Sequence, residues 1–240
     1  NPRGVLKVTA PTSFSRMHVT PYLPEFLERY PQIEIDMHLT DNFVDIIRDG
    51  FDVAIRIGEL RDSSLVARKL AAETRVICAA PSYLERAGMP RSLADLENHN
   101  CLSAGAQDVW RLESKEGQVQ FRVKGNIRSS SAELVRDALL AGLGLALRAT
   151  WDIGPELASG ALQVVLPEYR GSSNVAIYAV YPCREFMPAK VNAFIEHLAE
   201  RYGAEPYWEK SFAMPDLARQ SAPGRRSGAK KSSKRTVSAA

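Results

Sequence analysis

The chain has 240 residues, of which 45% are hydrophobic and 25% are charged, and its formal net charge is +3. This composition excludes a disordered polymer, and no run of the sequence approaches the roughly 20 apolar residues of a membrane span. The positive charge comes from residues 211–240, which hold seven basic side chains and one acidic one, so the rest of the chain has a net charge of −3. A body of that sign does not match the phosphates of a nucleic acid.

The first 60 residues alternate predicted strands and helices. Residues 33–39 alternate apolar and polar side chains with the period of a half-buried strand. Asp41 or Asn42 is placed to cap a second helix, which Gly50 would end. The expected elements are a strand at 5–10, a helix that opens near Thr12 and has an apolar stripe over 19–30, the strand at 33–39, the helix of Val44, Ile46 and Ile47, and a strand at 52–57. This order predicts a parallel sheet with right-handed crossovers.

The middle of the chain is less regular, whereas the last helix has the clearest pattern. Ser131 is placed to cap a helix that ends at Gly142. Pro188 starts and Gly203 ends a helix whose apolar residues recur every three or four positions. The other expected elements are strands at 75–80, 121–123, 162–166 and 175–181, and short helices capped by Ser82 and Ser92.

The cysteines favour a reducing compartment. Cys78, Cys101 and Cys183 are odd in number and widely spaced, so they predict neither a disulfide framework nor a CxxC pair for a metal or for redox chemistry. We therefore expect a cytoplasmic protein.

The sequence lacks the usual catalytic and metal-binding motifs. His18, His38, His99 and His197 have no His or Cys at metal-ligand spacing, and we expect them to be solvated. No GxSxG, Walker or GxGxxG motif occurs, and the sequence offers no basis for acid–base catalysis. We expect neither an enzyme nor a bound metal or cofactor.

Hydroxyl groups gather where two strands pass into helices. Thr12 and Ser13 follow the first strand, and Ser129 and Ser130 precede the helix that Ser131 caps. Free backbone N–H groups and the helix dipole make such helix starts attractive to anions. Each start can also be plain N-capping, but two of them in separate halves of the chain can face each other across a ligand cleft.

Several phrases of the sequence resemble the effector-binding domain of LysR-type transcriptional regulators. They are LPEFLERYPQIEIDMHLTD, GFDVAIRIG and DSSLVARKL within residues 4–70, and the segment from Asn126 to Trp151 with its GLGLAL turn. The resemblance covers residues 4–205. It implies an α/β fold like that of type 2 periplasmic binding proteins, in which two α/β subdomains are joined by two crossing strands and enclose a ligand cleft.

The resemblance also implies how the chain is divided. The expected parts are regulatory subdomain I at 4–76 plus 178–205, regulatory subdomain II at 77–177, crossings near Arg75–Ala79 and Val175–Ala179, and a basic disordered tail at 211–240. Such a tail can touch phosphate backbones, but a merely solvated tail is the favoured interpretation.

Family members hold a small effector between the subdomains, and the matching positions predict the site of this chain. The predicted ligand-binding residues are Thr12, Ser13, Phe14, Asp41, Asn42, Phe43, Ile57, Gly58, Ser103, Ser129, Ser130, Arg148, Thr150 and Trp151. Phe14 and Phe43 would supply an apolar wall and Arg148 a cationic anchor, so a small carboxylate is the expected ligand. Arg148 and Ala149 depart from the family, in which an apolar residue and a proline are common.

The resemblance implies a sensor that controls transcription through an N-terminal winged helix-turn-helix, which nothing in this chain matches. Because the chain starts at Asn1-Pro2-Arg3, we expect a fragment of a longer protein, with DNA bound only through the missing domain and no membrane partner. A homodimer or homotetramer would form through the first helix, with Tyr22 and Phe26 near its edge, and the 132–142 helix. The alternatives are a solute-binding protein of the same fold and an enzyme on that fold, which would need a base or nucleophile in the cleft.

Overall fold

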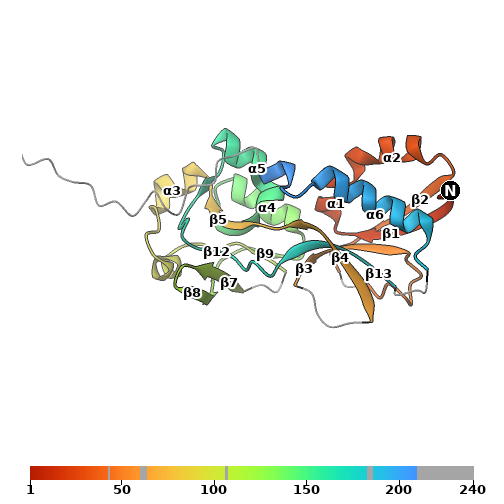
Figure 1. Ribbon diagram of the computed structural model, residues 1–240. Coiled ribbons are helices and arrows are strands. Elements are labelled where there is room, and N and C mark those ends of the chain that lie inside the picture. Colours follow the sequence, from red (N-terminus) through yellow and green to blue (C-terminus); the bar gives the residue numbers. More distant parts are fainter. Residues whose placement is uncertain (43, 60–63, 106–107, 183–185, 210–240) are drawn as a thin grey trace, which may run out of the picture.

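The computed structural model contains two main β-sheets with helices packed against them (Figure 1). It describes residues 1–42, 44–59, 64–105, 108–182 and 186–209. The predicted tail, Phe43 and Cys183 therefore lie outside the described residues. Within these ranges no helix has both the length and the apolar character needed to cross a membrane.

The first sheet has five strands in the order β2-β1-β3-β13-β4. β1 (Gly4–Ala10) pairs in parallel with β2 (Ile33–Leu39) and β3 (Val53–Gly58), as the sequence predicts. β13 (Ala176–Pro182) lies antiparallel between β3 and β4 (Leu65–Ala72), so the finished sheet is mixed rather than parallel. β4 had not been predicted as a strand.

Three helices cover one face of this sheet (Figure 1): α1 (Thr12–His18), α2 (Leu23–Arg29) and α6 (Ala189–Tyr202). Their apolar side chains form one core with those of the strands, including Leu6, Val8, Phe26, Ile55, Phe194 and Leu198. α6 begins directly after Pro188 and ends at Gly203, and this confirms the predicted limits.

The apolar stripe over 19–30 does not lie on one continuous helix. α1 ends at His18, a 3-10 turn covers Thr20–Tyr22, and α2 follows. The chain breaks here because Pro21 and Pro24 have no N–H to donate to a helical ladder.

The second predicted helix, after Asp41 or Asn42, is a single turn. Asp45 accepts two backbone hydrogen bonds of 3.1 Å from the residues two and three positions on, and residues 46–50 form the turn. Gly50 ends it with φ at +71°, a conformation that favours glycine.

The second sheet has the order β10-β5-β12-β7-β8, with β11 also paired to β5. Its strands are β5 (Arg75–Ala79), β7 (Val109–Ser114), β8 (Gly117–Arg122), β10 (Leu145–Ala149), β11 (Gln163–Val164) and β12 (Arg170–Gly171). In β5, Val76 and Cys78 belong to one hydrophobic core and Ile77 and Ala79 to another. This strand therefore has no polar alternation, because both of its faces are buried.

The remaining elements are α3 (Pro81–Ala87), α4 (Ala132–Leu140), α5 (Thr150–Ser159), the 3-10 helices η2 (Leu93–Asn98) and η3 (Tyr207–Glu209), and the strand pair β6 (Ser103–Ala104) and β9 (Arg128–Ser129). Ser131 caps α4 by accepting a 3.2 Å bond from Leu134 N–H, and Ser92 caps η2, as predicted. Ser82 does not cap α3, because Pro81 already occupies the first helical position. Of the strand predicted at 162–166 only Gln163–Val164 forms, and the one at 121–123 is the end of a longer hairpin strand.

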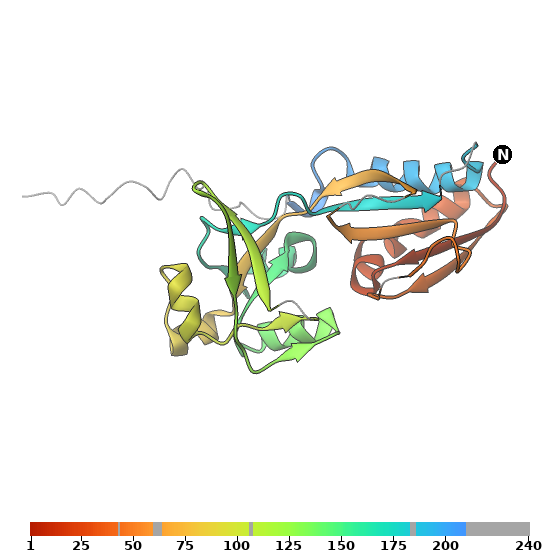
Figure 2. The ribbon, with the colours of Figure 1, turned by 90° about the horizontal axis from the view of Figure 1, so that it is seen from below.

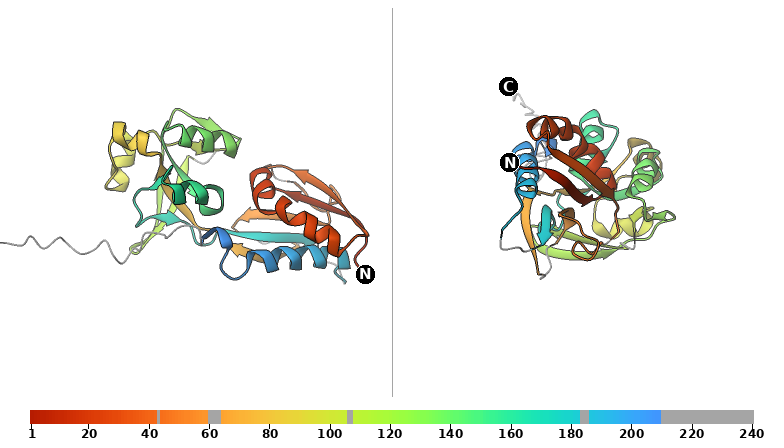
Figure 3. Two further views of the ribbon diagram at one scale, coloured as in Figure 1. Left: turned by 90° about the horizontal axis from the view of Figure 1, so that it is seen from above. Right: turned by 90° about the vertical axis from the view of Figure 1, so that its right-hand side faces the viewer.

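The chain crosses between the two sheets twice, from β4 to β5 and from β12 to β13. Figure 2 shows the sheets side by side with these crossings at their junction, and Figure 3 shows the N-terminus at the far end of the first sheet. After α6 the chain returns to the junction, where Trp208 of η3 is 4% exposed and packs on His18 with ring centroids 4.7 Å apart.

Candidate functional site

An ion pair joins α1 to α4, two helices that belong to different sheets. Arg16 Nη1 of α1 is 2.9 Å from Glu133 Oε1 in the first turn of α4. Arg16 is one turn beyond Thr12, and Glu133 follows Ser131 by two residues. The pair thus connects the two helices that follow the hydroxyl-rich segments singled out by the sequence, through the last turn of α1 and the first turn of α4.

On the side of the first sheet, the loop after β2 is tied to the start of α1. Thr12 N–H donates a 3.1 Å hydrogen bond to Asp41 Oδ1, and Asn42 N–H donates to Thr40 Oγ1. Ser13 is 8% exposed, and its hydroxyl oxygen is buried with no hydrogen-bond partner among the described residues. An unpartnered buried hydroxyl is costly unless something else bonds to it.

Phe14 does not form a wall of this site. It is fully buried and packs edge-on against Trp151, with ring centroids 5.2 Å apart, inside the core of the first sheet. Ile57 and Gly58 do lie at the end of β3, and the space around Gly58 is open.

On the side of the second sheet, Ser103 and Ser129 lie on the paired strands β6 and β9, and Ser130 follows β9. Ser103 of β6 lies opposite Arg128 of β9, and Ser129 Oγ accepts a 3.1 Å bond from Ser131 N–H. Ser103 is buried and Ser130 is exposed. These residues therefore form one hydroxyl-rich edge in front of α4.

Arg148 does not serve as a free cationic anchor. It is 7% exposed, and its Nε donates a 2.8 Å hydrogen bond to Asp152 Oδ2, with a second bond from Nη2 to the same oxygen. The carboxylate neutralises the guanidinium.

Thr150 and Trp151 lie at the junction between the sheets and bond to it. Thr150 Oγ1 lies within hydrogen-bond distance of two acceptors, the Thr74 carbonyl and the Glu209 carboxylate, which share its single proton, and Trp151 Nε1 donates a 3.2 Å bond to Glu73 Oε1. Burial raises the pKa of Glu73. These contacts assign both residues to the support of the junction rather than to an open ligand surface.

Two of the histidines expected to be solvated are buried. His18 Nε2 lies 2.9 Å from the carbonyl of Trp151, which can only accept, so Nδ1 takes the hydrogen bond from the Tyr207 hydroxyl at 2.6 Å. Burial lowers the pKa of His18, against the opposing effect of the Trp151 carbonyl. His197 is 2% exposed and bonds to the carbonyl of Tyr22.

A second bridge joins the sheets beyond Gly58. Glu59 accepts a hydrogen bond from Arg111 Nη1 at 3.4 Å and another from Ser172 Oγ at 3.3 Å. The sequence does not predict this bridge, the Arg16–Glu133 pair or the contact of Tyr207, because no local pattern links residues so far apart in the chain.

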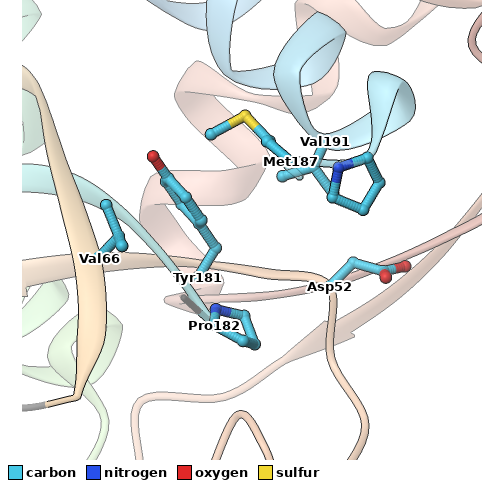
Figure 4. Close-up of a pocket in the computed structure, with 7 residues that line it drawn as sticks. Asp52, Val66, Tyr181, Pro182, Met187 and Val191 are labelled. Carbon is cyan, nitrogen blue, oxygen red and sulfur yellow. The ribbon is translucent and has the colours of Figure 1, made fainter. Parts of the chain in front are cut away.

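Two hollows lie elsewhere on the described surface. One of about 180 Å³ is lined by Asp52, Val66, Tyr181, Pro182, Met187, Pro188 and Val191 (Figure 4). The other, of about 370 Å³, is lined by Glu73, Thr74, Glu113, Ser114, Lys115, Glu168, Arg170, Gly171 and Ser173. None of the predicted ligand residues lines either hollow. The described residues also include no group of three His, Cys, Asp or Glu side chains arranged to hold a metal ion.

The sequence matches the model of one protein family and is similar to several transcriptional regulators. The sequence model of the LysR substrate binding domain matches residues 1–203. The HTH-type transcriptional regulator DmlR of Escherichia coli K12 is 39% identical over 210 residues, which cover 86% of this chain and 67% of DmlR. The HTH-type transcriptional activator TtdR of the same strain is 34% identical over 202 residues, 82% of this chain and 64% of TtdR. The chain thus spans about two thirds of the length of these curated relatives.

Solved structures of regulators of the same kind share the fold. The regulatory domain of CrgA from Neisseria meningitidis has a TM-score of 0.74 at 29% identity, covering 84% of this chain and 100% of that domain. Full-length AphB of Vibrio cholerae has a TM-score of 0.73 at 27% identity, covering 83% of this chain and 69% of AphB.

Proposed function

The chain belongs to the family of LysR substrate-binding domains, the effector-binding part of LysR-type transcriptional regulators, and we propose that its effector is a small carboxylate held between subdomain I (4–76 and 178–205) and subdomain II (77–177). The observation that supports this most is the Arg16–Glu133 pair, which joins α1 and α4, the two helices that open after hydroxyl-rich segments. The relatives are transcriptional regulators, so the enzyme and the solute-binding alternatives are set aside.

The proposed contacts of the effector are the hydroxyl groups and backbone N–H groups of the two helix starts. Ser13, with its unpartnered hydroxyl, and Thr12 would bind from α1. Ser103, Ser129 and Ser130 would bind from the edge in front of α4. Such groups are typical of sites for small anions.

A ligand that touches both subdomains shifts their relative arrangement only by its differential affinity for the two states. In the intact regulator that shift would reposition DNA-binding domains of the winged helix-turn-helix type, and DNA would be bound only through them. We also propose a cytoplasmic location and a homodimer or homotetramer, in keeping with the transcriptional relatives.

The test is a thermal-shift screen of small aromatic and aliphatic acids, followed by calorimetry with the acid that stabilises the protein most. Ser13→Ala should weaken binding by about 1.5–3 kcal/mol, because it removes a hydroxyl hydrogen bond to a charged group. Ser82→Ala, an exposed serine of α3, is the matched control and should bind like the unchanged protein. Unchanged affinity in both Ser13→Ala and Thr12→Val would remove the start of α1 from the site.

A further inference from the structure

We propose that Arg16 is the residue that recognises the carboxylate of the effector, and that Glu133 competes with the effector for it. This inference rests on the proposed function, and it assigns the cationic role to a residue other than Arg148. It also gives the ion pair between α1 and α4 a role in ligand selection.

Two other arginines near the junction, Arg148 and Arg136, are already neutralised by carboxylates that are buried or partly buried. Arg148 and Asp152 have side chains that are 8% and 2% exposed and are paired with each other. Arg136 pairs with Glu156 and lies 3.7 Å from Asp152 Oδ1. An incoming anion would have to displace a buried carboxylate from either guanidinium, which would leave that carboxylate without its partner.

Arg16 differs because its pair lies in solvent. The side chains of Arg16 and Glu133 are 68% and 45% exposed. Exposed ion pairs are held weakly, since water screens them and their long side chains lose freedom. A released Glu133 would simply be hydrated, so little opposes the exchange.

Arg16 is also placed for ligand recognition. It lies four residues after Thr12, so the two side chains share one face of α1. The described contacts of its guanidinium use a single nitrogen, Nη1. A guanidinium can bind a carboxylate through two parallel hydrogen bonds, and an effector carboxylate therefore offers Arg16 the same charge as Glu133 with a second bond.

Competition makes the two variants act in opposite directions. Arg16→Gln removes the cation and should weaken binding of an acid, whereas Glu133→Gln removes the competing carboxylate and should strengthen it. A pair that merely held the subdomains together would give the same direction of change for both variants.

The experiment measures binding of acetate, succinate and benzoate to the full chain by thermal shift and calorimetry, with succinamide and benzamide as uncharged probes. For the acids we expect at least about tenfold weaker binding in Arg16→Gln, an intermediate loss in Arg16→Lys, and about threefold tighter binding in Glu133→Gln. The matched control is Arg111→Gln, which breaks the other exposed bridge between the sheets, at 3.4 Å, and should change affinity less than about twofold. The uncharged probes should not respond to any of the variants.

Two results would overturn the inference while leaving the proposed site intact. One is equal acid affinity in the unchanged protein and Arg16→Gln. The other is a loss of affinity in Glu133→Gln. If none of the acids binds the unchanged protein, both the proposed carboxylate effector and the role of Arg16 are wrong.

Discussion

Arg148 and Asp152 form a buried ion pair at the junction of the two sheets, with side chains that are 8% and 2% exposed. Such a pair contributes little net stability compared with apolar residues, but removing one partner strands the other charge. Single substitutions in this pair, or of buried His18, should therefore affect the stability of the junction.

Asp152→Asn should therefore lower the free energy of unfolding by about 3–5 kcal/mol, because Arg148 is left buried without its carboxylate. Urea denaturation gives the measurement. The double variant Arg148→Met with Asp152→Asn should recover much of the loss. Asp108→Asn, which breaks the exposed pair with Arg122, is the control and should change stability little. An equally small effect of Asp152→Asn would show that the charge of Arg148 is met elsewhere.

His18 should make stability depend on pH. Burial holds the pKa of His18 below its ordinary value of 6.5 in the folded protein. Below about pH 6.5 the unfolded chain therefore binds more protons than the folded chain. The contribution of neutral, buried His18 to the free energy of unfolding is complete above about pH 6.5 and is lost as the pH falls.

The measurement is the free energy of unfolding at about pH 7.5 and about pH 5.5, where the slope from one histidine is at most about 1.4 kcal/mol per pH unit. Burial also lowers the pKa of His99, so the informative quantity is the difference between the unchanged protein and His18→Gln. The variant should show the weaker pH dependence, and identical slopes would contradict the assignment.

At the scale of helices and strands, local sequence patterns predict the position of an element where its end signals and its periodicity agree. α6 has a proline before it, a glycine after it and one apolar stripe, and β2 alternates polar and apolar residues. Both were predicted within a residue. The helix expected after Asp41 forms only a single turn, which Gly50 ends at a positive φ.

Contacts between residues far apart in the chain cannot be predicted from such local patterns. Tyr207 bonds to His18, which is 189 residues away, and Arg16 pairs with a residue 117 positions later. The same limit applies to the site. The hydroxyl-rich helix starts could be predicted from sequence, whereas the burial of Phe14 depends on rings that the rest of the fold brings to it.

Two truncated chains, one that keeps the 3-10 helix η3 and one that lacks it, should differ in stability. A chain that ends at Lys210 should unfold at the same temperature as the full chain, because the predicted tail is not expected to add packing. A chain that ends at Glu205 loses buried Trp208 and should be destabilised by about 3–5 kcal/mol. Trp208→Ala in the full chain checks that packing, rather than chain length, is responsible. A cooperative loss already in the longer truncation would show that the tail docks on the body.

At the scale of the whole molecule, the exposed apolar side chains bear on self-association. Phe26 is fully buried, so it cannot lie at the dimer edge predicted for it. On the same two helix regions, Leu27 is 37% exposed and Leu134 is 49% exposed. These leucines are better placed to be covered by a second copy of the chain.

We therefore predict that the protein sediments as a dimer of 26.5 kDa chains at micromolar concentration and that Leu27→Glu or Leu134→Glu shifts it toward the monomer. Met89→Glu, at a residue that is 51% exposed outside these helices, should leave the dimer unchanged. A monomer in the unchanged protein would rule out this form of association.

The position of β13 has a consequence for synthesis on the ribosome. β13 lies between β3 and β4, but β4 ends at Ala72 and β13 begins at Ala176. At cellular rates of translation, β3 and β4 wait about 5 to 20 seconds for the strand that joins them, and their facing edges stay unpaired during that time. The strands of the second sheet all emerge within this interval, from β5 to β12. The nascent chain should therefore complete its second sheet first, and the open edges of β3 and β4 are where chaperones would be needed.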